Sequence, residues 1–122
     1  MGLKGVRQRR GRKAEEAAAS FLETQGYKII ARNFRCPWGE LDVVALDGQE
    51  VVFVEVRSVT SLVFGPPQGS VDRRKRERLR RLALYFLQQR GWQNRPCRFD
   101  VLAVRLDRQE RPMYIEHLKG AF

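Results

Sequence analysis

The chain has 122 residues, 43% of them apolar, which suits a single domain with one core and excludes a wholly disordered protein. No apolar stretch approaches the ~20 residues of a membrane span, and the basic N-terminus lacks the apolar region of a secretory signal. The two cysteines and the single histidine, His117, lie too far apart in sequence to suggest a zinc site. We therefore expect a cytoplasmic protein with reduced thiols, and we assign His117 no role.

The charge is strongly positive, with a net charge of +10 and a pI of about 10.6. Such a balance indicates a polyanionic partner, with nucleic acid the first expectation and an anionic membrane surface the second. A soluble basic protein without such a partner is the alternative.

The first part of the chain predicts a basic arm followed by a helix. Residues 1–13 carry six basic side chains, three glycines and no acid, which predicts a flexible arm, either a frayed terminus or a phosphate-binding segment. From Ala14 to about Gln25 the apolar residues recur at helical spacing, and Gly26 is a good stop. Residues 14–122 are expected to form the folded domain.

Three strands are predicted next, over Tyr27–Phe34, Glu40–Leu46 and Glu50–Ser58, with a turn at Cys36–Gly39. Asp47-Gly48 lies between the second and third strands and is typical of a hairpin turn. The apolar runs of these two strands are nearly continuous, so both of their faces are expected to be covered.

The segment from Val59 to Gly69 contains Gly65-Pro66-Pro67 and is predicted to be a loop, either an ordinary surface connection or a substrate-side flap. A helix capped by Ser70 or Asp72 should then run to about Gln89. Its buried stripe is predicted to be Leu79, Leu82, Ala83, Phe86 and Leu87.

The last predicted elements are strands over Arg98–Leu106 and Met113–Glu116. The element order α-β-β-β-α-β-β predicts a single α/β (α+β) domain, in which a mixed sheet is flanked by helices.

Two pairs of residues within the strands suggest a site. Glu40 and Asp42 share a face because strand side chains alternate, and so do Glu55 and Arg57. A hairpin would place these acids side by side. Burying their carboxylates there costs free energy unless a cationic group or a metal ion pairs with them. Because hard cations prefer oxygen ligands, Asp42 and Glu55 are predicted to hold a divalent metal.

The second helix begins with a dense basic run over residues 73–81. Such a run could simply be a solvent-exposed helix face. However, like charges close together repel and destabilise a helix, which favours a phosphate-binding role for Arg73, Arg74, Arg76, Arg78 and Arg80. Lys75 precedes the buried stripe and is predicted either to reach an acid of the site or to extend to solvent. Arg57 or Lys75 could stabilise charge on a reacting phosphate.

Taken in order, a set of short motifs gives the chain a specific resemblance over nearly all its length. They are Gly11-Arg12-Lys13-Ala14-Glu15, Gly26-Tyr27, Asn33-Phe34, Gly39-Glu40-Leu41-Asp42, Val52-Phe53-Val54-Glu55-Val56-Arg57, Gly65, Lys75, Arg98-Phe99-Asp100-Val101 and Ala121-Phe122. The chain resembles the YraN-type family of uncharacterised bacterial proteins (UPF0102). The resemblance implies a restriction-endonuclease-like PD-(D/E)xK fold, similar to that of Holliday junction resolvases.

The resemblance also implies roles for individual residues. Glu15 matches an acid of the first helix, Asp42 the metal-binding strand acid, and Glu55 the acid of the (D/E)xK element. Arg57 replaces the lysine of that element, and Arg is a poor substitute where a lysine positions the attacking water. Lys75 could supply the missing ammonium.

Two functions follow and both stay open. One is a Mg²⁺- or Mn²⁺-dependent endonuclease acting on structured or branched DNA. The other is a DNA- or RNA-binding module that keeps the nuclease fold but lacks the catalytic lysine. DNA is expected ahead of RNA, no membrane partner is expected, and a homodimer is left open.

Overall fold

The computed structural model describes residues 3–59 and 71–122, and it has the predicted element order. A single domain combines two helices with a five-stranded mixed sheet, which confirms the α+β fold class. The elements are α1 (Leu3–Thr24), β1 (Lys28–Cys36), β2 (Gly39–Asp47), β3 (Glu50–Val59), α2 (Arg73–Gln89), β4 (Cys97–Leu106) and β5 (Pro112–Leu118).

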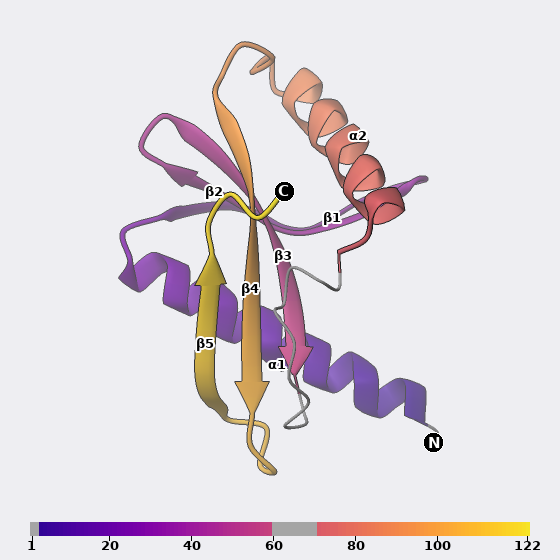
Figure 1. The fold of residues 1–122 in the computed structure, drawn as a ribbon, viewed down its shortest axis with the longest axis vertical. Coiled ribbons are helices and arrows are strands. Elements are labelled where there is room, and N and C mark those ends of the chain that lie inside the picture. The colour runs from indigo at the N-terminus through magenta and orange to yellow at the C-terminus, as the bar shows by residue number, and fades with distance from the viewer. Residues whose placement is uncertain (1–2, 60–70) are drawn as a thin grey trace.

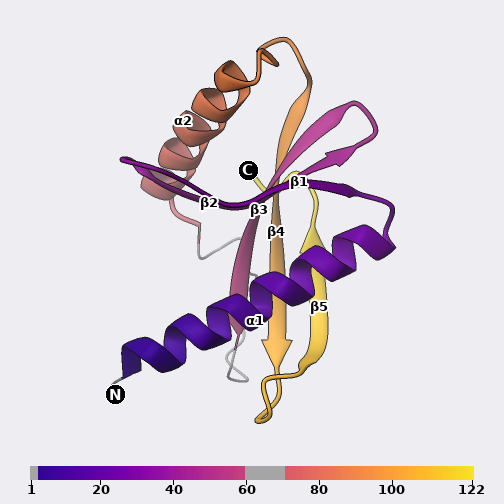
Figure 2. The same cartoon turned by 180° about the vertical axis from the view of Figure 1, so that it is seen from behind.

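The strands lie in the sheet in sequence order, from β1 at one edge to β5 at the other. Only β3 and β4 pair in parallel among these neighbours, and the other three pairs are antiparallel. Parallel neighbours need a crossover connection, and α2 lies within it. Helix α1 crosses one face of the sheet and α2 packs on the other, as the two opposite views show (Figures 1 and 2).

The two buried clusters follow from alternation along β3. Val52 and Val54 face α1, where they pack with Ala18 and Leu22, whereas Phe53 faces α2. This arrangement confirms that the central strands are covered on both sides. Since Glu55 is two residues beyond Phe53, the same alternation directs it toward α2.

Helix α2 begins and packs as its sequence predicts. The Asp72 side chain accepts a hydrogen bond from the Lys75 backbone N–H at 2.8 Å, which caps the first turn. The buried residues of the helix are the five predicted ones, Leu79, Leu82, Ala83, Phe86 and Leu87.

Helix α1 corrects a predicted boundary. It begins at Leu3 rather than Ala14, because the Lys- and Arg-rich segment is itself a good helix former despite its glycines. The mobility of residues 1–13 stays a prediction. Residues 60–70, which hold most of the predicted flap, lie outside the described residues. Neither α1 nor α2, as far as the chain is described, has an apolar stretch that could cross a bilayer.

A polar network centred on the buried Asp100 joins strands near the β2–β3 turn. Arg98 donates to Asp47 at 3.0 Å, to Glu50 at 2.7 Å and to Asp100 at 3.0 Å. Asp100 is fully buried and also bonds His117 Nε2 at 2.7 Å. Although burial opposes its ionisation, these hydrogen bonds hold the pKa of Asp100 below its usual range. His117, which was given no role, is therefore a packing and hydrogen-bonding residue of the core.

Candidate active site

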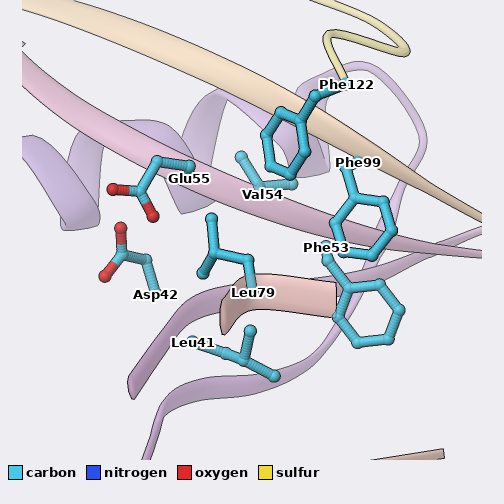
Figure 3. Close-up of a pocket in the computed structure, with 8 residues that line it drawn as sticks. All are labelled: Leu41, Asp42, Phe53, Val54, Glu55, Leu79, Phe99 and Phe122. Carbon is cyan, nitrogen blue, oxygen red and sulfur yellow. The ribbon is translucent and has the colours of Figure 1, made fainter. Parts of the chain in front are cut away.

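The site forms where the β2–β3 ladder stops. The last register pair is Val43 with Val54, and one position further the same register sets Asp42 opposite Glu55. There the backbone pairing is replaced by a side chain, since the Val56 N–H donates to Asp42 Oδ2 at 2.9 Å. The two carboxyl groups face one another (Figure 3), as the hairpin predicted.

Two more acids complete the cluster around Asp42. Glu15 comes from α1 and Glu40 from β2, and one carboxylate oxygen from each of Glu15, Glu40 and Asp42 lies within 4.8 Å of the others. These are hard oxygen donors, the kind that Mg²⁺ and Mn²⁺ prefer. The donor set therefore fits a divalent cation. This set differs in one respect from the predicted pair of Asp42 and Glu55. Asp42 is grouped with Glu15 and Glu40, and Glu55 lies opposite Asp42.

Asn33 of β1 ties two of these acids together. In the orientation that satisfies its amide, its side-chain nitrogen donates to Glu15 Oε1 at 3.0 Å and to Glu40 Oε1 at 2.9 Å. Asn33 has a positive φ of 54°, a conformation that asparagine tolerates better than most residues. Sequence reasoning gave it no role; the Asn-Phe pair within a predicted strand was the only signal.

Glu55 has a cationic partner from the other side of the site. Lys75 Nζ lies 2.6 Å from Glu55 Oε1, and the two side chains are 24% and 9% exposed. The prediction that Lys75 reaches an acid of the site is confirmed. The pair forms because Lys75 begins the sheet-facing side of α2 and Glu55 continues the same face of β3 beyond Phe53.

Burial and the neighbouring acids raise the pKa of Asp42. Burial, the charge of Glu55 and the charges of Glu15 and Glu40 raise its pKa to about 8, against the opposing hydrogen bond from Val56. The pKa of Glu15 is also raised, by burial first and by Glu40 second, although Arg32 lowers it. A bound cation would relieve the same repulsion.

An apolar wall borders the Asp42–Glu55 pair on the α2 side of the sheet (Figure 3). Phe122 stacks on Phe99 with ring centroids 5.1 Å apart, and the Ala121 N–H donates to the Phe99 carbonyl at 2.8 Å. The wall limits solvent on that side, which strengthens electrostatic interactions at the carboxylates. Its members are Leu41, Phe53, Leu79, Phe99 and Phe122.

The predicted phosphate-binding arginines differ in how far they reach solvent. Arg73, Arg74, Arg78 and Arg80 are exposed on α2. Arg76 is half-buried, because its Nε donates to the Val71 carbonyl at 2.9 Å and its guanidinium lies over the Phe122 ring. Arg57 is also half-buried on β3, two residues beyond Glu55. Phosphate binding by these residues stays a prediction.

Comparison with known proteins gives the family. A model described as "Uncharacterised protein family UPF0102" matches residues 14–104, which include every acid of the site and Lys75. The chain belongs to the UPF0102 family. This confirms the resemblance found in the sequence motifs.

Individual UPF0102 proteins match over nearly the whole chain. A UPF0102 protein of Moorella thermoacetica is 60% identical over 96% of this chain and 98% of its own length. One of Pelotomaculum thermopropionicum is 48% identical over 92% of the chain and 93% of its own length, and one of Nocardia farcinica is 45% identical over 97% and 92%. The family resemblance therefore spans the complete site.

Removing the Asp42 charge should stabilise the metal-free protein. Because the pKa is raised from 3.8 to about 8, the ionised side chain costs folding stability that grows as pH rises through this window. At pH 8.5 in EDTA, we expect Asp42→Asn to raise Tm by about 5 °C, and at pH 4 to change it little. Mg²⁺ should raise Tm of the unsubstituted protein but not of the variant.

Differential scanning fluorimetry measures these shifts, and Glu23→Gln, which removes an exposed acid of α1, is the charge-matched control. An Asp42→Asn protein less stable than the parent at pH 8.5 in EDTA would contradict the electrostatic account of the cluster.

Proposed function

We propose that the chain binds nucleic acid and cleaves it as a divalent-metal-dependent endonuclease acting on structured or branched DNA. The observation that carries this proposal is the Lys75–Glu55 pair at 2.6 Å, opposite Asp42. It supplies an ammonium group beside the acids, although β3 carries Arg57 where the nuclease pattern has lysine. The free thiols of Cys36 and Cys97 agree with action in the reducing cytoplasm.

The acids and Lys75 suit separate parts of phosphodiester hydrolysis. Asp42, with Glu15, Glu40 and Glu55 around it, would hold Mg²⁺ or Mn²⁺, which polarises the phosphate and acidifies water. Lys75 would hold an attacking water or stabilise negative charge that builds on the phosphate oxygens. The apolar wall keeps bulk water from one side, and the half-buried Arg57 presents a fork suited to a phosphate.

The exposed arginines of α2 support the DNA-binding part of the proposal. Arg74 and Arg78 lie on the helix that carries Lys75, so a strand held by them would run beside the acids. Phosphate contacts give affinity without sequence readout, which suits an enzyme that recognises DNA shape.

The alternative is a binding module without cleavage. Arg57 favours it, since an arginine at this position can clamp a phosphate but positions water poorly. The two functions are separated by whether any Mg²⁺- or Mn²⁺-dependent product forms.

Cleavage of a synthetic four-way junction tests the chemistry. With Mn²⁺ or Mg²⁺, we expect product from the unsubstituted protein and at least ~100-fold lower rates for Asp42→Asn and Lys75→Ala. Lys28→Ala, which removes an exposed lysine at the start of β1, should cleave normally. Gel electrophoresis of end-labelled strands gives the rates, and circular dichroism checks folding.

A correctly folded Lys75→Ala protein with full activity would remove the proposed role of this residue. A protein that binds the junction yet cleaves no branched, single-stranded or duplex DNA or RNA with either ion would support the binding module instead.

The salt dependence of binding tests the role of α2. In EDTA, affinity for duplex DNA should fall by roughly 0.9 log units per log unit of salt for each phosphate contact. Reversing two charges, in Arg74→Glu/Arg78→Glu, should weaken binding and lower that slope by about 2. Fluorescence anisotropy measures both quantities.

The matched control reverses two exposed charges near β5, in Arg108→Glu/Lys119→Glu. Equal losses in the two double variants would mean that net charge alone drives binding and that α2 is not the contact surface.

A further inference from the structure

Trp38 is a large aromatic residue left half open to solvent. It lies in the turn between β1 and β2, and 49% of its surface is exposed. A single exposed apolar residue needs no explanation by itself. What distinguishes Trp38 is that its ring packs against α2 and that arginines flank the turn that carries it.

The support comes from α2. The Trp38 ring makes an edge contact with Tyr85 at 5.0 Å between centroids and 89° between planes. The Tyr85 hydroxyl accepts a hydrogen bond from Gln89 Nε2 at 2.8 Å, which fixes the tyrosine in turn. Tyr85 also contacts Phe34 at 6.2 Å, so the aromatic contacts continue into β1.

The turn itself is pressed against the same helix. Gly39 has a φ of 149°, and a Cβ at this position would lie 3.3 Å from Leu82 Cδ1 and 3.7 Å from Arg78 Cδ. A side chain there would crowd Leu82 and would be strained by the positive φ, so glycine suits this close approach. Both views show the β1–β2 turn beside α2 (Figures 1 and 2). Trp38 is therefore held in place before any ligand arrives.

Arginines of α2 and β1 lie close to the β1–β2 turn in sequence or in contact with it. Arg78 lies against the turn at Gly39, and Arg81 is one helical turn before Tyr85 on the same side of α2. The side chain of Arg35 on β1 is 78% exposed and forms an ion pair with Glu40 at 3.1 Å. A flat aromatic surface among arginines suits a nucleic-acid base whose phosphates lie nearby.

Trp38 is also connected to the acids of the candidate active site. It precedes Asp42 by four residues, about 13 Å along an extended strand. Arg78 is three residues after Lys75 on α2, so its side chain emerges one turn further along the helix. A strand that crosses the acids and passes Arg78 would reach Trp38 within a few nucleotides.

We propose that Trp38, supported by Tyr85, is a base-stacking platform for an unpaired DNA base close to the phosphate held at the acids. The proposal rests on the proposed function for that phosphate. A paired base cannot leave its stack without a cost of a few kcal/mol, whereas single strands and branch points offer unstacked bases. Trp38 thus selects DNA with unpaired bases over continuous duplex.

Binding measurements in EDTA test the platform without cleavage. The probes are a single-stranded oligo(dT) of about 12 nucleotides and a blunt duplex of equal length. We expect Trp38→Ala to bind oligo(dT) about tenfold more weakly and the duplex within about twofold of the parent protein. Trp38→Phe, which keeps a ring, should lose less. Tyr114→Ala removes an exposed aromatic at the opposite sheet edge and should bind as the parent does.

A spectroscopic readout reports stacking directly. The chain has two tryptophans, so Trp92→Phe leaves Trp38 as the only one. The guanidiniums of Arg90 and Arg95 lie over the Trp92 ring, and phenylalanine retains a ring there. Oligo(dT) should quench Trp38 fluorescence in this variant, and the duplex should quench it much less.

Unchanged oligo(dT) affinity in Trp38→Ala, absent quenching, or an equal loss on duplex DNA would overturn the platform. Cleavage separates this failure from failure of the proposed function. If Asp42-dependent cleavage occurs while Trp38→Ala behaves as the parent protein, the endonuclease stands and the platform is wrong. If Trp38 is required for oligo(dT) binding by a protein that cleaves nothing, the platform stands as a binding site and the cleavage proposal is wrong.

Discussion

A half-buried carboxylate, Asp42, lies at the point where β2 and β3 stop pairing, and the rest of the site is arranged around it. Its Oδ2 takes the Val56 N–H that a ladder partner would otherwise take, while the register directs Glu55 toward it. Glu15 of α1 and Glu40 of β2 each place a carboxylate oxygen within 4.8 Å of one from Asp42. Like charges directly opposite one another destabilise a sheet, so this arrangement works against folding unless the charge is compensated.

The chain compensates for only part of this charge with its own groups. Lys75 pairs with Glu55, and Asn33 donates to Glu15 and Glu40, yet Asp42 keeps a pKa raised to about 8. Residual acid crowding of this kind is expected at functional sites, which depart from the rules that stabilise a fold. The Arg98–Asp100–His117 network contrasts with it, because opposite charges and hydrogen bonds satisfy the buried carboxylate there. The charges of the Arg98 network are therefore balanced within the protein, whereas those around Asp42 are balanced only in part.

Periodicity predicted the parts of the site that depend on local rules. Strand alternation and the Asp47-Gly48 turn set Asp42 against Glu55, and helical spacing aimed Lys75 at the sheet. Contacts between residues that are far apart in the sequence could not be predicted from these local patterns. Asn33 has a positive φ and joins Glu15 of α1 to Glu40 of β2, and His117 meets Asp100 across paired strands. The charge and glycine content of residues 1–13 suggested a flexible arm, although their helix propensity allows α1 to begin at Leu3. Trp38 lies in a predicted turn, and nothing in the sequence indicated its contact with α2.

Anomalous diffraction from crystals soaked in MnCl₂ would locate a bound Mn²⁺ ion and show whether Asp42 is one of its ligands. We expect a peak about 2.0–2.6 Å from a carboxylate oxygen of Asp42, with Glu15, Glu40 or Glu55 supplying a further ligand. Lys75 should stay within reach of Glu55. Saturating Mn²⁺ that leaves Asp42 without a peak, or that binds only at acids outside this cluster, would contradict the metal site and with it the proposed nuclease chemistry.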